Sequence, residues 1–106
     1  MDIEDWREKI DEVDTQILEL INKRSKFSIK IGEIKTDKGM PIHSPEREKI
    51  IMNRMQQENP GPLSDDRVLR IFERIIDESR NLEKDIAKDQ ISNRLHKIRH
   101  PKQIKR

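Results

Sequence analysis

The sequence predicts an all-α fold of three helices, which are long, short and medium in chain order. Apolar residues recur at spacings of three and four within residues 6–38, 45–58 and 64–88, and no segment shows the alternation of a β-strand. Ser, Asp, Pro and Gly flank these segments, as they commonly flank helices. Lys, Arg, Asp and Glu make up 42% of the chain. Because their signs alternate, we expect them to cover the wet faces of amphipathic helices.

The first helix is predicted from about residue 6, or slightly earlier, to about residue 38. Asp2 and Asp5 give an N-terminal capping pattern, and Gly39 followed by Met40 and Pro41 is a C-terminal stop. A helix of about 33 residues is roughly 50 Å long, which is more than the two later segments can cover. We therefore expect its apolar stripe to meet a second copy of the chain in a homodimer. The stripe consists of Trp6, Ile10, Val13, Ile17, Leu20, Phe27, Ile31 and Ile34.

The second and third helices are predicted from their N-terminal caps. Ser44 and Pro45 suit the cap and the first position of a helix that ends near Glu58. Ser64 caps a third helix, with acid in its first turn, that is predicted to end near Lys88. Residues 1–88 are thus expected to form one helical domain, and residues 89–106 a basic extension. Residues 91–106 hold six Lys and Arg and no acidic residue, so residues 1–90 carry a net charge of −4.

Polar side chains fall on the apolar stripes of two helices. At about 100° per residue, Arg24 and Lys35 lie within about 40° of the apolar line of the first helix. Ser79 and Glu83 lie equally close to that of the third. Taken singly, such residues are commonly snorkelling cations, salt-bridged carboxylates or packed hydroxyls. Because burying an unpaired charge costs several kcal/mol, the pair of cations instead predicts an anion-binding pocket. Arg47 and Glu48, at the start of the second helix, are expected to complete it.

Several classes of function lack the residues that they need. The chain has no cysteine, which excludes disulfides and thiolate zinc sites and fits a reducing, cytoplasmic compartment. Its three histidines lack acidic companions at ligand spacing, so no metal site is predicted. The confined basic excess does not favour a nucleic-acid partner, and no signal peptide or membrane-length apolar run is present. With no phosphate loop and no nucleophile paired with a base, no cofactor is expected, and the pocket must act by charge and shape.

Six stretches of the sequence, in order over about residues 5–88, resemble the all-helical, type II chorismate mutases. The likeness is greatest to the mutase modules that are fused to other shikimate-pathway enzymes. The stretches are residues 6–14, 17–24, 31–35, 41–48, 61–64 and 71–80.

The resemblance implies an intertwined helical homodimer whose two sites each use residues of both chains. It implies the intramolecular Claisen rearrangement of chorismate to prephenate, in phenylalanine and tyrosine biosynthesis. By the same resemblance, Arg24 and the partner's Arg7 would hold the two carboxylates of the substrate. Lys35 would donate to the ether oxygen, where negative charge grows as the C–O bond breaks.

The remaining site residues are also implied by the resemblance. Glu48 and the backbone around Ser44 would hold the ring hydroxyl, and Arg47 would support the charge network. Ser79 would lie near a substrate carboxylate, and Glu83 takes a position where relatives have Gln or Glu. Many relatives carry Asp where this chain has Ser44.

Two other functions stay open at the level of sequence. One is an isochorismate pyruvate-lyase of the same fold, although the residues near the third-helix site favour the mutase. The other is a non-catalytic helical protein that senses chorismate or dimerises as a partner of another shikimate-pathway enzyme, with the basic extension as its docking arm. The intact set of charged and polar residues favours an enzyme: Arg7, Arg24, Lys35, Arg47, Glu48 and Ser79.

Overall fold

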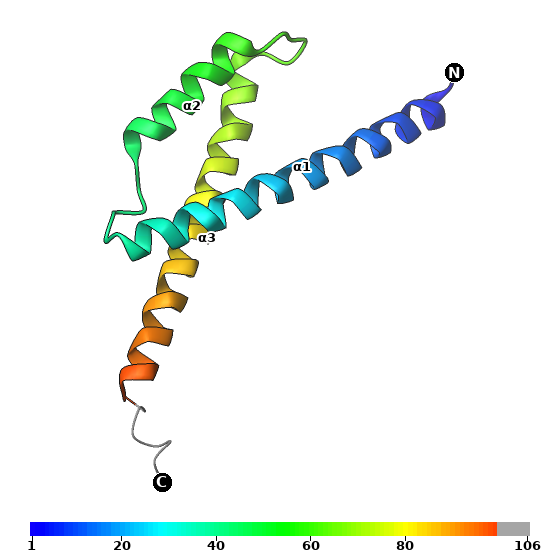
Figure 1. Ribbon diagram of the computed structural model, residues 1–106. Helices are drawn as coiled ribbons and strands as arrows, with labels where there is room; N and C mark the ends of the chain where they lie inside the picture. The colour runs from blue at the N-terminus through cyan, green and yellow to red at the C-terminus, as the bar shows by residue number, and fades with distance from the viewer. Residues whose placement is uncertain (100–106) are drawn as a thin grey trace.

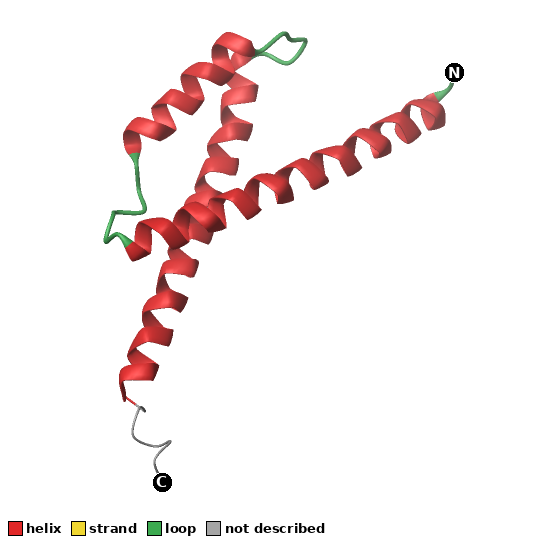
Figure 2. Ribbon diagram, in the orientation of Figure 1, coloured by secondary structure: helices red, strands yellow, loops and turns green. Residues whose placement is uncertain are grey.

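The computed structural model describes residues 1–99 as three α-helices joined by two short loops (Figures 1 and 2). Helix α1 spans Ile3–Asp37, α2 spans Pro45–Glu58 and α3 spans Asp65–Arg99. The described residues contain no strand, which confirms the predicted all-α fold. None of these helices has an apolar stretch of the length that a bilayer crossing requires.

Both ends of α1 are fixed by the residues that predicted them. The carboxylate of Asp2 accepts a hydrogen bond from the Asp5 amide at 3.1 Å, and that of Asp5 accepts one from the Asp2 amide at 2.9 Å. This reciprocal pair satisfies two donors that a helix start leaves free. At the other end, Gly39 adopts a φ of 67°, which costs glycine no steric strain. The chain therefore leaves the helix after Asp37 and turns toward α2.

Serine hydroxyls begin the other two helices, as the sequence predicted. The Ser44 hydroxyl accepts a hydrogen bond from the Arg47 amide, and the Ser64 hydroxyl accepts one from the Arg67 amide, each at 3.4 Å. Pro45 occupies the first position of α2, where a missing N–H is not needed.

The predicted end of the third helix near Lys88 is wrong, because α3 continues to Arg99 and equals α1 in length at 35 residues. No Gly or Pro lies between Asp65 and Arg99, so nothing in the local sequence stops the helix. An ion pair between Arg94 and Asp37 ties this continuation to the end of α1. The predicted division between domain and extension after residue 88 thus falls inside a helix. Its functional meaning stays a prediction, and residues 100–106 lie outside the described part of the chain.

The three helices pack around α3. Helix α1 crosses α3 near its middle, and α2 runs back along the N-terminal half of α3 (Figure 1). The N-terminal half of α1 projects away from the other helices, which gives the chain extents of 72 × 33 × 14 Å. Among residues 1–97, whose side-chain burial is described, the buried side chains are few: Ser28 on α1, Ile51 on α2 and Ile76 on α3. Such a small core positions the helices but leaves most apolar surface uncovered.

The apolar stripe of α1 is exposed in the single chain. Trp6 is 55% exposed and Phe27 is 59% exposed, and the other stripe residues are also about half exposed or more. Since burial of apolar area is the main force that stabilises a fold, this surface is expected to need a partner.

Candidate active site

A cavity of about 280 Å³ lies where the C-terminal half of α1, the start of α2 and the middle of α3 meet. Seven of the eight residues that were predicted for the site line it. They are Arg24, Lys35, Ser44, Arg47, Glu48, Ser79 and Glu83. The fold therefore brings together polar residues that lie far apart in the sequence.

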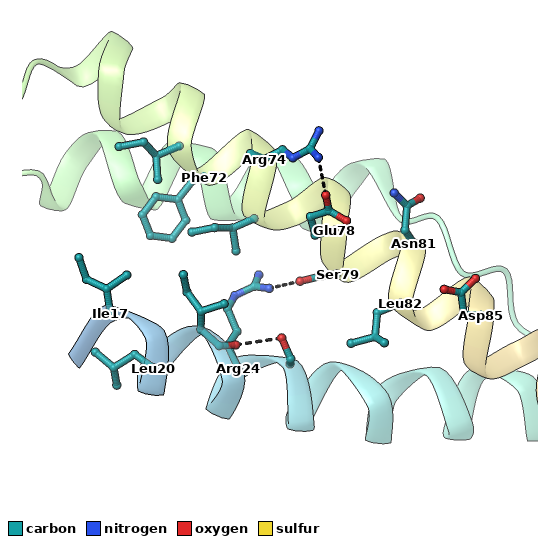
Figure 3. Close-up of a pocket in the computed structure, with 14 residues that line it drawn as sticks. Ile17, Leu20, Arg24, Phe72, Arg74, Glu78, Ser79, Asn81, Leu82 and Asp85 are labelled. Atoms are coloured by element: carbon teal, nitrogen blue, oxygen red, sulfur yellow. Dashed lines mark hydrogen bonds and ion pairs between the residues drawn. The ribbon is translucent and has the colours of Figure 1, made fainter. Parts of the chain in front are cut away.

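Arg24 and Ser79 face each other from α1 and α3. The guanidinium of Arg24 donates a hydrogen bond to the Ser79 hydroxyl (Figure 3). Burial, and next the positive charge of Arg47, lower the pKa of Arg24, while the carboxylate of Glu83 acts in the opposite direction. An arginine guanidinium still keeps its proton in a protein. Arg24 is thus a cation that Ser79 orients and that forms no ion pair with a carboxylate of residues 1–99. Such a group can bind an anionic ligand.

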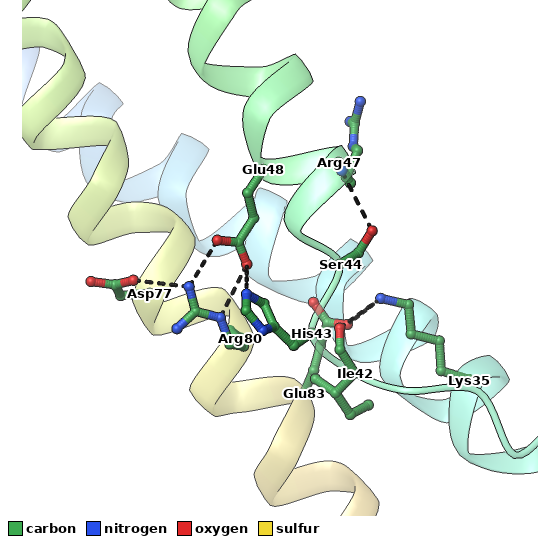
Figure 4. Close-up of polar contacts among 9 residues, drawn as sticks. All are labelled: Lys35, Ile42, His43, Ser44, Arg47, Glu48, Asp77, Arg80 and Glu83. Carbon is green, nitrogen blue, oxygen red and sulfur yellow. Dashed lines mark hydrogen bonds and ion pairs between the residues drawn. The ribbon is translucent and has the colours of Figure 1, made fainter.

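Lys35 reaches the same cavity from the last turn of α1. Its ammonium donates a hydrogen bond to the Ile42 carbonyl at 2.9 Å and lies 3.6 Å from Oε1 of Glu83 (Figure 4). The second distance is that of an ion pair and is too long for a hydrogen bond. Two directions of the ammonium are therefore fixed by the protein, and a third donor is left for a ligand.

Glu83 is the most desolvated acid of the cavity. Its side chain is 12% exposed, and its Oε1 is buried without a hydrogen-bond partner. Burial raises the pKa of Glu83 above its usual value, although the charges of Lys35 and Arg24 act against this. An unsatisfied buried oxygen is costly, so Glu83 is poised to bind a polar group of a ligand.

Gly32 explains how Glu83 comes so close to α1, and the sequence did not reveal it. Gly32 is buried, and a Cβ built on it would lie 3.2 Å from the Glu83 Cα and 3.3 Å from its Cβ. A side chain at this position would push α3 away from the cavity. The available signal was a lone glycine inside a helical pattern, which often marks close packing.

Glu48 is held by Arg80, a residue that the sequence did not place in the site. Arg80 donates two hydrogen bonds to the Glu48 carboxylate, at 3.0 and 2.9 Å (Figure 4). These bonds lower the pKa of Glu48, and burial opposes them. The one sequence signal was that Arg80 directly follows Ser79 and lies three residues before Glu83. It is therefore a neighbour of both polar residues on the helix surface.

Ser44 and Arg47 lie at the mouth of the cavity. The Ser44 hydroxyl is used as the cap of α2, where it accepts the Arg47 amide. The guanidinium of Arg47 is exposed and extends away from Glu48 and Lys35 (Figure 4). Among the residues predicted for the site, Arg47 is thus free to swing toward a ligand.

Arg7 does not reach the cavity of its own chain. It lies on the projecting half of α1, where its exposed side chain pairs with Glu4 at 2.7 Å. Arg7 and Arg24 therefore do not converge within one chain.

An apolar groove of about 920 Å³ adjoins the cavity between α1 and the first half of α3 (Figure 3). Arg24 and Ser79 line both spaces. The apolar lining includes Ile17, Leu20, Ile21, Ile71, Phe72, Ile75 and Leu82.

The chemistry open to the cavity is electrostatic. Arg24 and Lys35 supply positive charge, and the Ser79 hydroxyl accepts a hydrogen bond from the Arg24 cation. Within residues 1–99, no three His, Asp or Glu side chains are grouped as a metal ion would require. The arrangement fits an anionic ligand and can stabilise negative charge that develops beside Lys35.

Comparison with known proteins identifies the family. The family model described as chorismate mutase type II matches residues 6–84. A chorismate mutase of Methanocaldococcus jannaschii is 38% identical over 79 residues, which cover 74% of this chain and 80% of that protein. A bifunctional chorismate mutase/prephenate dehydratase of Aquifex aeolicus is 36% identical over 89 residues. The match covers 80% of this chain and 25% of that protein, so the chain spans about a quarter of this bifunctional relative.

A solved structure shares the fold as well. A chorismate mutase of Thermus thermophilus superposes with a TM-score of 0.76 at 33% identity, and the match covers 77% of this chain and 93% of the other.

Proposed function

This chain belongs to the type II chorismate mutase family, and we propose that it catalyses the intramolecular Claisen rearrangement of chorismate to prephenate. The observation that carries the proposal is the meeting of Lys35 and Glu83 with Arg24 in one cavity. A concerted rearrangement needs a substrate held in its reactive conformer and stabilisation of the charge that develops. It needs no nucleophile.

Arg24 binds one carboxylate of chorismate in this proposal. Its guanidinium donates to Ser79, and no carboxylate of residues 1–99 lies within hydrogen-bond distance of it. A guanidinium can bind a carboxylate through two parallel hydrogen bonds. The hydroxyl of Ser79 then lies next to the bound carboxylate.

Lys35 and Glu83 act on the ether oxygen. As the C–O bond breaks, this oxygen gains negative charge, which the Lys35 ammonium stabilises. Glu83 contributes best when protonated, because the neutral acid donates a hydrogen bond whereas its anion would repel the growing charge. The raised pKa of Glu83 favours the protonated form.

Glu48 and the backbone near Ser44 hold the ring hydroxyl. The hydroxyl of Ser44 is engaged in capping α2, so the contribution of this residue is assigned to its main chain. Arg47 completes the charge network from the exposed side.

We further propose that the site is completed in a homodimer by the partner's Arg7, which binds the second carboxylate. Two features of the single chain support this. The stripe of α1 is uncovered from Trp6 to Ile34, and the apolar groove lies beside Arg24. A second copy seated in the groove would cover both, and its α1 carries Arg7 on the half that projects.

A role in phenylalanine and tyrosine biosynthesis, in the cytoplasm, is part of the proposal. The bifunctional relative, whose name pairs the mutase with prephenate dehydratase, supports a partnership with another shikimate-pathway enzyme.

The test is to supply the purified chain with chorismate and, in a parallel assay, with isochorismate. The loss of chorismate absorbance is followed, and prephenate and pyruvate are measured separately in both assays. Formation of prephenate alone is expected. Pyruvate from isochorismate would instead identify the pyruvate-lyase. Binding of chorismate without any product would identify a sensor, and both of these outcomes would overturn the proposal.

A further inference from the structure

Arg80 makes a two-pronged contact across the interface between α2 and α3. Its Nε donates to Oε2 of Glu48 at 3.0 Å, and its Nη2 donates to Oε1 at 2.9 Å (Figure 4). Nη2 also donates to Oδ1 of Asp77, one turn earlier on α3, at 3.1 Å. Asp77, on the same helix, therefore helps to orient the guanidinium of Arg80 toward Glu48. Parallel hydrogen bonds of this kind fix the plane of a carboxylate as well as its position.

We propose that Arg80 is a positioning residue for the reaction, which holds Glu48 so that its carboxylate accepts a hydrogen bond from the ring hydroxyl of chorismate. This inference rests on the proposed function, and it assigns Arg80 a role that acts only through Glu48.

The acceptor sites of Glu48 leave room for the hydroxyl. An ionised carboxylate offers about four lone-pair sites, of which Arg80 uses one on each oxygen. Nε2 of His43 lies 3.5 Å from Oε2, an ion-pair distance when the imidazole is protonated. Lone-pair sites therefore remain on the carboxylate after Arg80 has bound it, and Glu48 lines the cavity. The geometry points to the Glu48 carboxylate as the acceptor of the hydroxyl while Arg80 holds it.

A glutamate without such a partner would have to be ordered by the substrate. Its side chain has three rotatable bonds, and fixing them on binding lowers affinity. Arg80 fixes them beforehand. The two side chains are 23% and 25% exposed, so the contact is partly shielded from water.

Charged groups from every neighbouring element act on Glu48. They are Lys35 on α1, His43 in the loop before α2, and Arg80 and Glu83 on α3. Asp77 acts on Arg80. The hydrogen bonds of Arg80 are the largest of the influences that lower the pKa of Glu48. Removing Arg80 should therefore raise the pKa of Glu48.

The kinetic test compares Arg80→Gln and Arg80→Lys with the wild-type chain. Arg80→Gln is expected to lower kcat/KM about 10- to 100-fold, as is typical when the partner that orients a functional group is removed. Most of the loss should lie in KM, because the hydroxyl is bound in both the ground state and the transition state. Arg80→Lys keeps the positive charge but cannot make the two parallel hydrogen bonds of a guanidinium. Its KM should therefore lie between those of the wild type and Arg80→Gln. Arg70→Gln is the control, since Arg70 is exposed on the same helix and lines neither the cavity nor the groove.

Two further measurements separate positioning from a loss of structure. In a Glu48→Gln background, Arg80→Gln should change KM less than about twofold, because a residue that acts through another is not additive with it. The carboxyl carbon resonance of Glu48 should titrate at higher pH in Arg80→Gln than in the wild type or Arg70→Gln. Circular dichroism should show equal helix content in all variants.

The inference would be overturned if Arg80→Gln matched Arg70→Gln in KM, or if its effect multiplied with that of Glu48→Gln. These outcomes differ from failure of the proposed function, which would appear as a wild-type chain that makes no prephenate.

Discussion

Lys35 and Glu83 approach each other from α1 and α3, at 3.6 Å between Nζ and Oε1, and have different tasks. Lys35 is fixed by the Ile42 carbonyl, whereas one oxygen of Glu83 is buried without a hydrogen bond. This buried oxygen destabilises the fold, as strained groups at functional sites often do. At the scale of the residue, the proposed chemistry depends on these two groups and on Arg24.

Replacing Lys35 with alanine should lower kcat/KM by at least about a hundredfold, because loss of one preorganised donor to developing oxyanion charge typically costs about 3–4 kcal/mol. Arg24→Ala should be similarly damaging. The measurement is steady-state conversion of chorismate, with Lys30→Ala as the control, since that lysine is 78% exposed on the same helix. Near-normal turnover by Lys35→Ala with unchanged assembly would refute the role of the ammonium.

Activity should fall as pH rises through the pKa of Glu83. Burial raises this pKa, so the protonated donor persists to higher pH than in an ordinary glutamate, and it is lost above the shifted value. Glu83→Gln donates a hydrogen bond at every pH and should flatten the profile. The idea would fail if kcat/KM of the wild type were flat from about pH 5 to 8.5, above the reference value of about 4.3, with Glu83→Gln showing the same flat profile.

Part of the site could be predicted from angles alone. Arg24, Lys35, Ser79 and Glu83 stand out because each lies on an apolar line of its own helix. Arg80 has the sequence context of a surface arginine, and its partner is on another helix. Which residues meet between helices depends on their packing register, which a single helix does not encode.

At the scale of the element, caps decide where the helices begin and end, and these positions were predicted closely. The exception is the end of α3, which was placed near Lys88. The apolar stripe and the family resemblance both end there, but a helix without a Gly or Pro stop continues. The pairing of Arg94 with Asp37 could not be foreseen, since it depends on the crossing of α1 and α3.

Gly32→Ala tests the close contact between α1 and α3. Alanine gains about 0.5–1 kcal/mol of helix stability over glycine, but overpacking typically costs about 1–3 kcal/mol. Because the new Cβ would lie 3.2 Å from the backbone of Glu83, the second effect should win. We expect kcat/KM to fall by about tenfold, as for a small misplacement of a catalytic group.

The control for this variant is Gly39→Ala, where a Cβ meets nothing within 4 Å but φ is 67°. It should lower the melting temperature and leave kcat/KM nearly unchanged. If Gly32→Ala behaved in the same way, the contact would not matter to the site.

Truncation after Gln90 tests the division between domain and extension. It removes the last turns of α3 and the ion pair between Arg94 and Asp37, whose side chains are 52% and 60% exposed. Exposed pairs contribute about 0–1 kcal/mol, so a modest loss of thermal stability is expected. Turnover should stay within a few-fold of the full chain. A collapse of activity in a truncated chain that keeps its helix content would instead assign the extension to the site.

At the scale of the whole molecule, the single chain is open and elongated. Within the described residues few side chains are buried, and the apolar stripe of α1 and the adjoining groove are uncovered. The need for a second copy could be argued from the length of that stripe. The arrangement of two copies could not, because periodicity shows which face is apolar but not which part of a partner covers it. In the proposed dimer, the second copy of the chain covers both the apolar stripe of α1 and the groove.

Mixing two inactive variants tests the shared site most directly. Arg7→Ala and Arg24→Ala homodimers should each make little prephenate, because every site lacks one of the two arginines. After subunit exchange, a mixed dimer has one site with both arginines and one with neither. With equal mixing, prephenate formation should recover to about one quarter of the wild-type rate, since half of the dimers are mixed and each has one intact site of two. Exchange is verified by mass spectrometry of differently labelled chains. No recovery after verified exchange would contradict a chorismate mutase site built from two copies of this chain.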